Sequence, residues 1–211
     1  MFQNIGKETF FLFDENHECY DQVDYASGDI FNTEFNLEPR LAAMYQLNEF
    51  SSIKASYGRT VQYAQLASNA SAGIPFDMWF PTSPNIKPQK CDQFSIGYFR
   101  NLLNNEIETS VEFFYKNIHN VIDFADNATL IGNLYIDGEV RAGKGYAYGA
   151  EFLLRKNFGD FSGWISYTYS KSMRKIPGIN YDREYVSPYD KPHNISIVLN
   201  YAFNKRFDVS A

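Results

Sequence analysis

The residue types best suited to metal binding gather near the start of the chain. The group comprises Asp14, Glu15, His17, Glu18, Cys19 and Asp21. Histidine, cysteine and carboxylates are the usual zinc ligands, but a structural zinc site needs a second cysteine or histidine pair at a characteristic spacing. The sequence around this segment has no such pair. We therefore expect a solvated acidic loop, with no metal and no cofactor.

Two carboxylates, Glu108 and Glu112, share one face of a predicted strand. Strand rise separates them by about 13 Å, whereas a retaining glycosidase pair needs about 5 Å. We interpret them as the polar lining of an interior. His119 and His193 have no partners in sequence that suggest a catalytic triad, and no Gly-x-Ser-x-Gly motif is present. The sequence does not predict an enzyme.

A glycine-rich stretch is formed by Gly143, Gly145 and Gly149. A phosphate-binding loop would need a following helix and a Gly-Lys-Ser/Thr sequence, and both are missing here. Small residues on a strand let the sheet twist or let another domain approach closely.

Aromatic side chains in two long predicted loops are the best candidates for ligand contact. They are Phe76, Asp77, Met78, Trp79 and Phe80 within the stretch 72–81, and Tyr181, Tyr185 and Tyr189 further along. Exposed rings beside a few polar groups suit a sugar ring or a siderophore. The alternative is that these rings pack on neighbouring loops, and the sequence favours this alternative over direct contact.

Alternation with a period of two is the main structural signal. Phe161, Ile165 and Tyr169 alternate with Ser162, Ser166 and other small polar residues, and residues 193–203 repeat the pattern. Such a period indicates a strand with one apolar face and one polar face. We predict an all-β, antiparallel up-and-down meander. Its strands are 36–47, 52–63, 92–102, 106–124, 144–156, 161–173 and 192–203, with a truncated strand at 207–211.

The predicted connections alternate in length. Residues 48–51, 103–105, 157–160 and 204–206 form short turns, while 64–91, 125–143 and 174–191 form long loops. Strands of 9 to 11 residues or more, with short turns at one rim and long loops at the other, are typical of outer-membrane barrels. The alternative is a soluble sandwich or barrel in which the apolar face points to a core.

Charged residues fall almost entirely on the face predicted to line the lumen. Arg59 is the visible exception, near the predicted extracellular end. A charge on the lipid face near the membrane midplane costs about 2–4 kcal/mol for Arg or Lys. Rings near strand ends would form interfacial girdles: Tyr63, Phe124, Tyr146, Phe161, Tyr169 and Phe203.

Composition excludes several classes. No apolar run approaches the roughly 20 residues of a membrane helix. The net charge of −6, without a basic stripe, argues against nucleic-acid binding.

Cys19 and Cys91 are the only cysteines, and either a disulfide or two free thiols is compatible with their positions. Residues 1–7 lack signal-peptide features, so either a front segment is missing or the chain is not exported.

The first 35 residues are expected to form an extracellular loop. Within it, 9–13 and 29–35 are predicted as the arms of a small hairpin around residues 14–28.

Several stretches resemble the C-terminal barrel half of TonB-dependent outer-membrane receptors of the Bacteroidetes type. They are 37–41 (LEPRL), 87–89 (KPQ), 145–151 (GYAYGAE), 163–172 (GWISYTYSKS) and 189–194 (YDKPHN). The resemblance implies a 22-stranded barrel, a plug domain inside it and a TonB box. Residues 1–211 carry neither plug nor TonB box and too few strands to close such a barrel. We therefore interpret the chain as one partial barrel domain.

The expected function is nutrient uptake by an outer-membrane receptor. The resemblance implies lipid, TonB and a nutrient ligand as partners, together with a possible surface lipoprotein. The cargo would be a siderophore, cobalamin, a glycan or a peptide. The alternatives are a passive porin or structural membrane protein, and a soluble secreted domain that binds carbohydrate through Trp79.

Overall fold

A computed structural model describes residues 1–14, 18–67, 78–133, 136–204 and 206–210. Its main feature is a nine-stranded antiparallel sheet, which confirms the all-β prediction. The principal strands are β3 (Arg40–Asn48), β4 (Ser51–Gln62), β7 (Gln89–Leu102), β8 (Ile107–Phe124), β9 (Val140–Lys156), β10 (Phe161–Lys175), β12 (His193–Asn204) and β13 (Phe207–Ser210), while β11 (Tyr185–Val186) pairs with β10.

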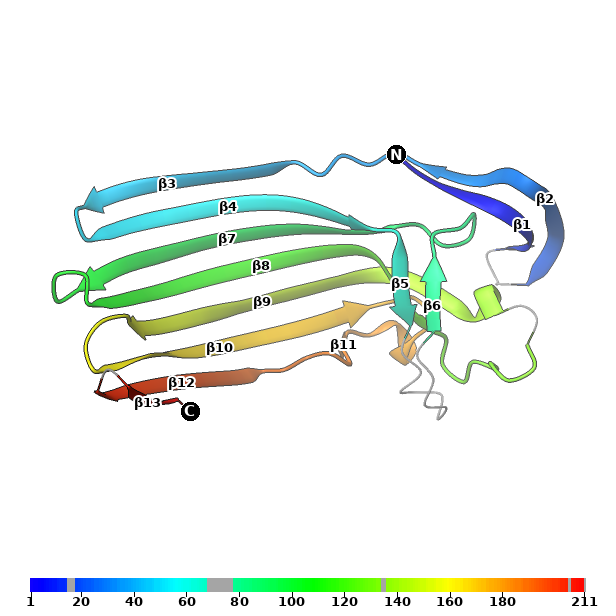
Figure 1. The fold of residues 1–211 in the computed structure, drawn as a ribbon. Coiled ribbons are helices and arrows are strands. Elements are labelled where there is room, and N and C mark those ends of the chain that lie inside the picture. The colour runs from blue at the N-terminus through cyan, green and yellow to red at the C-terminus, as the bar shows by residue number, and fades with distance from the viewer. Residues whose placement is uncertain (15–17, 68–77, 134–135, 205, 211) are drawn as a thin grey trace.

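Successive principal strands lie side by side in the order β3, β4, β7, β8, β9, β10, β12 and β13, so this part of the sheet is an up-and-down meander (Figure 1). The sheet is open, because β3 and β13 each pair on one side only. An open sheet with two free edges fits the interpretation as part of a larger barrel, since closure alone removes edges.

The predicted strands are all present, with shifted ends. β3 begins at Arg40, not at Asn36, because Pro39 has no backbone N–H to donate to a ladder. β7 and β9 begin earlier than predicted, at Gln89 and Val140. The extra residues lie at the loop end, where the strands continue beyond the region of clear alternation.

Tight turns and long connections lie at opposite ends of the sheet, as the sequence predicts (Figure 1). The β7–β8 turn contains three consecutive residues with left-handed backbone: Leu103, Asn104 and Asn105 have φ of 49°, 53° and 71°. Asparagine tolerates this region well, whereas a leucine is a true outlier. Residues 104 and 105 therefore suit the turn better than residue 103 does.

The first 34 residues form a hairpin that is larger than predicted. It consists of β1 (Phe2–Phe13) and β2 (Cys19–Glu34), and Phe13 is paired with Cys19. The prediction of a loop over 14–28 is wrong, because most of that stretch is strand. Three register shifts interrupt the β1–β2 ladder and break the alternation that would have marked its strands.

Two faces of the main sheet differ sharply in polarity. One row of directly opposed residues across seven strands consists of Tyr45, Ile53, Tyr98, Val111, Phe152, Tyr167 and Ile195. The neighbouring row on the other face consists of Met44, Lys54, Gly97, Glu112, Glu151, Thr168 and Asn194. We call these the outer face and the lumen face.

Large apolar side chains on the outer face remain uncovered. Ile195 is 64% exposed and Phe94 is 52% exposed, and no layer of the described chain packs over them. A contiguous exposed apolar surface of this extent marks a contact with lipid or another apolar partner. The soluble alternative required Ile195, Ile197 and Leu199 to be covered by protein, and within the described residues they are exposed.

The charges on the outer face are more numerous than predicted. By register, Lys90, Asp92, Arg100, Lys144, Lys156, Lys171 and Lys175 share this face with Arg59. Arg59 is not the single exception, because alternation alone does not reveal charges at strand ends. None of these charges lies in the two central rows, those of Ile96 and Tyr98, where the cost would be largest.

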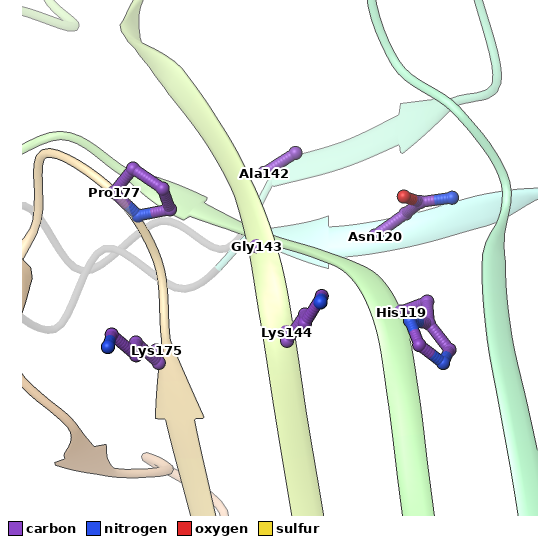
Figure 2. Close-up of a pocket in the computed structure, with 7 residues that line it drawn as sticks. All are labelled: His119, Asn120, Ala142, Gly143, Lys144, Lys175 and Pro177. Carbon is purple, nitrogen blue, oxygen red and sulfur yellow. The ribbon is translucent and has the colours of Figure 1, made fainter.

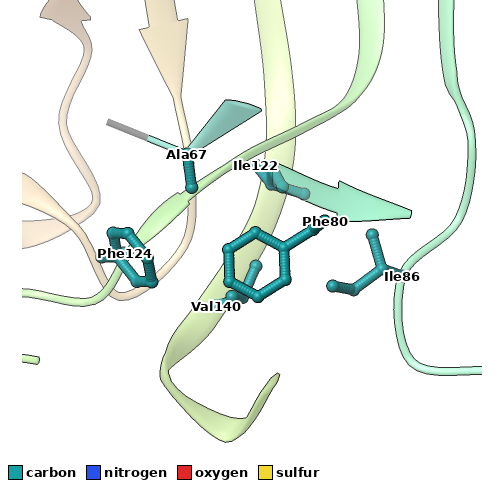
Figure 3. Packing of buried hydrophobic residues seen from close by; sticks show 6 residues of the cluster. All are labelled: Ala67, Phe80, Ile86, Ile122, Phe124 and Val140. Carbon is teal, nitrogen blue, oxygen red and sulfur yellow. The ribbon is translucent and has the colours of Figure 1, made fainter. Parts of the chain in front are cut away.

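The buried core lies at the loop end, not between two layers. Its largest cluster consists of Ala67, Phe80, Ile86, Ile122, Phe124 and Val140 (Figure 3). Phe124 is only 1% exposed, so its prediction as a girdle residue is wrong.

Tyr63 stacks on Phe2 with ring centroids 4.5 Å apart, so this predicted girdle residue also packs against the β1–β2 hairpin. No helix among the described residues is long and apolar enough to cross a membrane.

Candidate ligand site at the loop end

A short hairpin, β5 (Ala64–Ala67) and β6 (Met78–Pro81), places the first group of predicted aromatics. Gln65 pairs with Phe80, and Leu66 pairs with Trp79. Adjacent residues of a strand point to opposite faces. Phe80 is therefore buried at 5% exposure and meets Phe124 edge-on at 5.8 Å, whereas Trp79 is 62% exposed.

The hairpin is fixed to the loop base by polar contacts. Thr82 donates its backbone N–H and its hydroxyl to the Tyr63 carbonyl, at 2.8 and 2.7 Å. The Gln65 amide donates to the Lys87 carbonyl at 3.0 Å. Together with the burial of Phe80, these bonds hold Trp79 in a defined position and reduce the entropy that a ligand would otherwise have to remove.

The predicted set from the 72–81 stretch is thus divided. Phe76 and Asp77 lie outside the described residues. Met78 packs against the buried cluster and Phe80 belongs to it, so for these two the packing alternative describes the structure. Trp79 remains available for ligand contact.

Tyr181 occupies an unusual turn. Asn180, Tyr181 and Asp182 form the short 3-10 segment η2 (Asn180–Asp182), and their φ angles are 51°, 56° and 59°. Left-handed backbone costs roughly 1–2 kcal/mol per residue for non-glycine residues. Strained backbone of this kind persists only where contacts with the surrounding structure hold it, and it is found most often at functional sites. Tyr181 itself is 90% exposed.

Two aspartate side chains accept backbone hydrogen bonds from this turn. Gly178 donates its N–H to Asp182 Oδ1 at 2.7 Å, and Asn180 donates its N–H to Asp126 Oδ2 at 2.9 Å. The Tyr181 ring contributes nothing to the buried clusters, so its position is compatible with contact to a molecule arriving from outside.

Tyr185 has a different environment. It pairs with Arg174 across β10 and β11, and its hydroxyl donates to Asp123 Oδ2 at 3.1 Å. Arg174 Nη1 binds the same oxygen at 3.1 Å. Burial, together with the Asp123 carboxylate, raises the pKa of Tyr185 well above its usual range. Tyr185 therefore anchors the 176–192 loop, and Tyr189 lies with its ring 5.8 Å from the Arg174 guanidinium.

The lumen face carries charges of both signs. Arg155 pairs with Glu108 at 3.9 Å, which agrees with the prediction of a polar lining. Glu112 lies directly opposite Glu151, and neither has an ion pair among the described residues. Directly opposed like charges destabilise a sheet. Sequence reasoning identified Glu112 but missed Glu151, because only the cross-strand register brings them together.

Several other candidates have simple explanations. A β-carbon at Gly149 would meet the Tyr169 carbonyl oxygen and approach the Phe114 ring to 2.7 Å, so this glycine allows close strand packing. Cys19 and Cys91 are free thiols, which leaves the disulfide alternative without support. Within the described ranges no three His, Cys, Asp or Glu side chains could hold a metal ion, and residues 15–17 fall outside them.

Three solved structures have a similar fold. The FpvAI–pyocin S2 complex matches with a TM-score of 0.58 at 16% identity, covering 90% of this chain and 23% of that chain. P. aeruginosa FpvA bound to heterologous pyoverdines matches with 0.55 at 17% identity, covering 87% and 22%. The siderophore receptor PirA from Acinetobacter baumannii matches with 0.54 at 16% identity, covering 83% and 28%. At these identities the likeness shows the fold.

The chain spans about a quarter of the length of these three matched chains. A search of curated proteins found no match. Residues 20–210 match the family described as "TonB dependent receptor-like, beta-barrel". That range includes every strand of the main sheet, and the one-sided loops and the two-faced strands agree with it. The chain belongs to the family of TonB-dependent receptor β-barrels, which are receptors of the outer membrane.

Proposed function

We propose that this chain is part of the transmembrane barrel of an outer-membrane receptor that takes up a nutrient with energy supplied through TonB. The chain would bind and guide the ligand without catalysing a reaction. A plug domain and a TonB box would act from segments outside residues 1–211. We further propose that the receptor is of the Bacteroidetes type that the sequence resembles, and that a surface lipoprotein is a possible partner.

One observation carries the membrane part of this proposal. On the outer face the two central rows are aromatic or aliphatic from β3 through β10, while the lumen face between them carries polar and charged side chains such as Lys54, Glu112 and Glu151. In hydrocarbon every backbone polar group must be satisfied internally, and a sheet achieves this through its strand ladder. An alternating sheet with one apolar face therefore suits lipid on one side and a hydrated lumen on the other.

Trp79 and Tyr181 are the residues we propose for ligand contact. Both are exposed aromatics at the loop end, and both are held by buried or hydrogen-bonded neighbours. Flat rings offer large contact area at low entropic cost, which suits a cyclic or planar ligand. Because neighbours of this fold include a siderophore receptor, an iron–siderophore complex is the first ligand to test. Cobalamin, a glycan or a peptide are the other classes.

Uptake measurements on the receptor that contains this chain test the proposal. We expect accumulation of a radiolabelled iron–siderophore that stops when TonB is deleted or the proton gradient is collapsed. The double variant Trp79→Ala/Tyr181→Ala should weaken binding about 10- to 100-fold, because stacked rings contribute on the order of 1–3 kcal/mol together. Phe158→Ala is the matched control, since Phe158 is 61% exposed at the opposite rim.

The alternatives give different results. A passive porin would carry solute at a rate independent of TonB and of the proton gradient. A soluble carbohydrate-binding domain would remain in the aqueous fraction without detergent. Equal ligand binding by the double variant and the Phe158→Ala control would show that Trp79 and Tyr181 do not contact the ligand. The transport proposal would then be decided by whether uptake depends on TonB and on the proton gradient.

A further inference from the structure

Four basic side chains form a continuous row across four neighbouring strands. Lys90 on β7 is paired with His119 on β8, His119 with Lys144 on β9, and Lys144 with Lys175 on β10. Directly opposed residues point to the same side of an antiparallel sheet. The row therefore presents three lysines and one histidine together, within a width of about 14 Å at the usual strand spacing.

This row lies on the outer face. Lys144 has the same parity on β9 as Tyr148 and Phe152, and the β9–β10 ladder has no register shift between them. Counting outward from the central rows, the row of Tyr57, Phe94, Tyr115 and Tyr148 comes first, then the row of Arg59, Asp92, Asn117 and Tyr146, and then the basic row. The basic row is thus the third beyond the central apolar rows, toward the loops.

The spacing along β9 suits the edges of a bilayer. Lys156 and Lys144 share the outer face and are twelve positions apart. At about 3.3 Å per residue and a tilt near 40°, this corresponds to roughly 30 Å along the membrane normal. The apolar band of such barrels is about 25 Å tall, which is less than the separation of the two lysines. If Lys156 lies at the periplasmic edge of this band, Lys144 therefore lies in the layer of lipid headgroups on the opposite side.

A cavity of about 500 Å³ lies along the row. His119, Lys144 and Lys175 line it, together with Asn120, Ala142, Gly143 and Pro177 (Figure 2). Asn120 has a φ of 57° and interrupts the β8–β9 register, and its side chain donates to the Pro88 carbonyl at 2.9 Å. This bulge bends β8 locally beside the cavity.

None of the four basic groups forms an ion pair among the described residues. Asp92, which lies one row away on the outer face, already accepts hydrogen bonds from Arg59 Nε and Nη2 at 2.8 and 2.9 Å and from the Tyr57 hydroxyl. Glu184 accepts a hydrogen bond from Tyr146 at 3.0 Å. Opposed like charges repel, so an anion placed between them would remove an existing cost as well as add attraction.

We propose that Lys90, His119, Lys144 and Lys175 bind the headgroup of an outer-leaflet lipid that carries at least two phosphates. The inference rests on the proposed membrane location. Its position in the headgroup layer argues for a lipid as the source of the phosphates, and the width of the row exceeds a single phosphate. Lys171, on the same face of β10, extends the basic surface toward the acyl chains.

Binding of a diphosphorylated glycolipid by the receptor that contains this chain provides the test. The protein is reconstituted into phosphatidylcholine vesicles with and without diphosphoryl lipid A, and retained lipid is counted by native mass spectrometry. Each lysine near a charged membrane surface is worth about 1 kcal/mol, or about fivefold in affinity. We expect Lys144→Gln/Lys175→Gln to bind about 25-fold more weakly.

Lys156→Gln is the matched control, since this lysine lies on the same face of the same strand at the other edge. It should leave lipid A binding unchanged. Equal binding by the double variant and the wild type would overturn the inference, as would full displacement of the lipid by inorganic phosphate. Failure of all variants to enter phosphatidylcholine vesicles would instead contradict the proposed function, so the two failures are distinguishable.

Discussion

At the loop end, the Arg174 guanidinium and the Asp123 carboxylate form an ion pair at 3.1 Å. Asp123 is 6% exposed, and its carboxylate accepts from both Arg174 and Tyr185. Loss of one partner from a buried ion pair leaves an uncompensated charge. We therefore expect this pair to hold the 176–192 loop, which presents Tyr181, on the sheet.

We predict that Asp123→Ala destabilises this loop by about 3–5 kcal/mol, because Arg174 would remain buried without its partner. Tyr185→Phe should cost less, about 1.5–3 kcal/mol, since it removes one hydrogen bond to a charged group. Hydrogen exchange of residues 183–190 measures both opening free energies. Equal protection in Asp123→Ala and wild type would show that the ion pair does not anchor the loop.

A second residue links the loops to pH. Asp137 lies in η1 (Ile136–Glu139), where burial raises its pKa above the ordinary value of 3.8 and a hydrogen bond from the Asn85 amide partly opposes this. A raised carboxyl pKa means that the folded state favours the protonated form. Its contribution to stability is therefore fully present below pH 3.8 and is lost as pH rises through the folded pKa.

For Asp137→Asn we expect this pH dependence to disappear while the contact with Asn85 is kept. Equilibrium unfolding of the wild type and the variant from acidic to neutral pH tests this expectation, with Asp208→Asn, at an exposed position of β13, as the control. The variant should gain stability relative to the wild type as pH rises. A wild type whose stability increases more steeply than that of the variant over this range would contradict the sign.

At the scale of elements, the long strands were predictable and the small ones were not. Residues 161–173 and 192–203 alternate over many positions, so period and length identify them, and the shortening of β3 follows from Pro39. β5 and β6 have four residues each, too few for a period to be recognised. The burial of Phe80 depends on Phe124, which is distant in sequence, so only the tertiary structure reveals it.

The candidate site was likewise predictable only in part. The sequence placed Trp79 and Tyr181 in loops as candidates for ligand contact, but it gave no means of separating these exposed rings from Phe80 and Tyr185. The basic row and the Glu112–Glu151 pair were not predictable, because both depend on cross-strand register. Register is determined by the whole ladder and by bulges such as that at Asn120, which have no clear local signal.

Close packing between β9 and β10 leads to a prediction for this pair of strands. Gly149→Ala should destabilise the sheet by about 1–3 kcal/mol, because the added methyl would overlap the Tyr169 carbonyl and the Phe114 ring. Gly58→Ala is the matched control, since its nearest neighbour, Arg40 Cγ, would be 3.9 Å away. Urea titrations of the two variants in lipid vesicles compare them. A Gly149→Ala variant as stable as Gly58→Ala would disprove the tight contact.

At the scale of the whole molecule, the two faces of the sheet should respond differently to charge. Phe152 and Leu153 are adjacent apolar residues on β9, but Phe152 lies on the outer face and Leu153 on the lumen face. Phe152→Arg should cost about 2–4 kcal/mol in a bilayer, whereas Leu153→Arg keeps its charge hydrated. Folding yield into vesicles checks this pair, and a greater loss for Leu153→Arg would reverse the assignment of the faces.

The most direct test of the central claim, that the outer face meets lipid, is a nitroxide scan of residues 109–117 on β8. Cys19 and Cys91 are first replaced by serine, single cysteines are introduced and labelled, and collision with oxygen and with a water-soluble nickel complex is measured in vesicles. We predict a period of two, with Val111, Phe113 and Tyr115 accessible to oxygen and Ser110, Glu112 and Phe114 accessible to nickel or shielded by protein. Uniform accessibility along β8, or the opposite phase, would contradict a membrane-spanning sheet with this orientation.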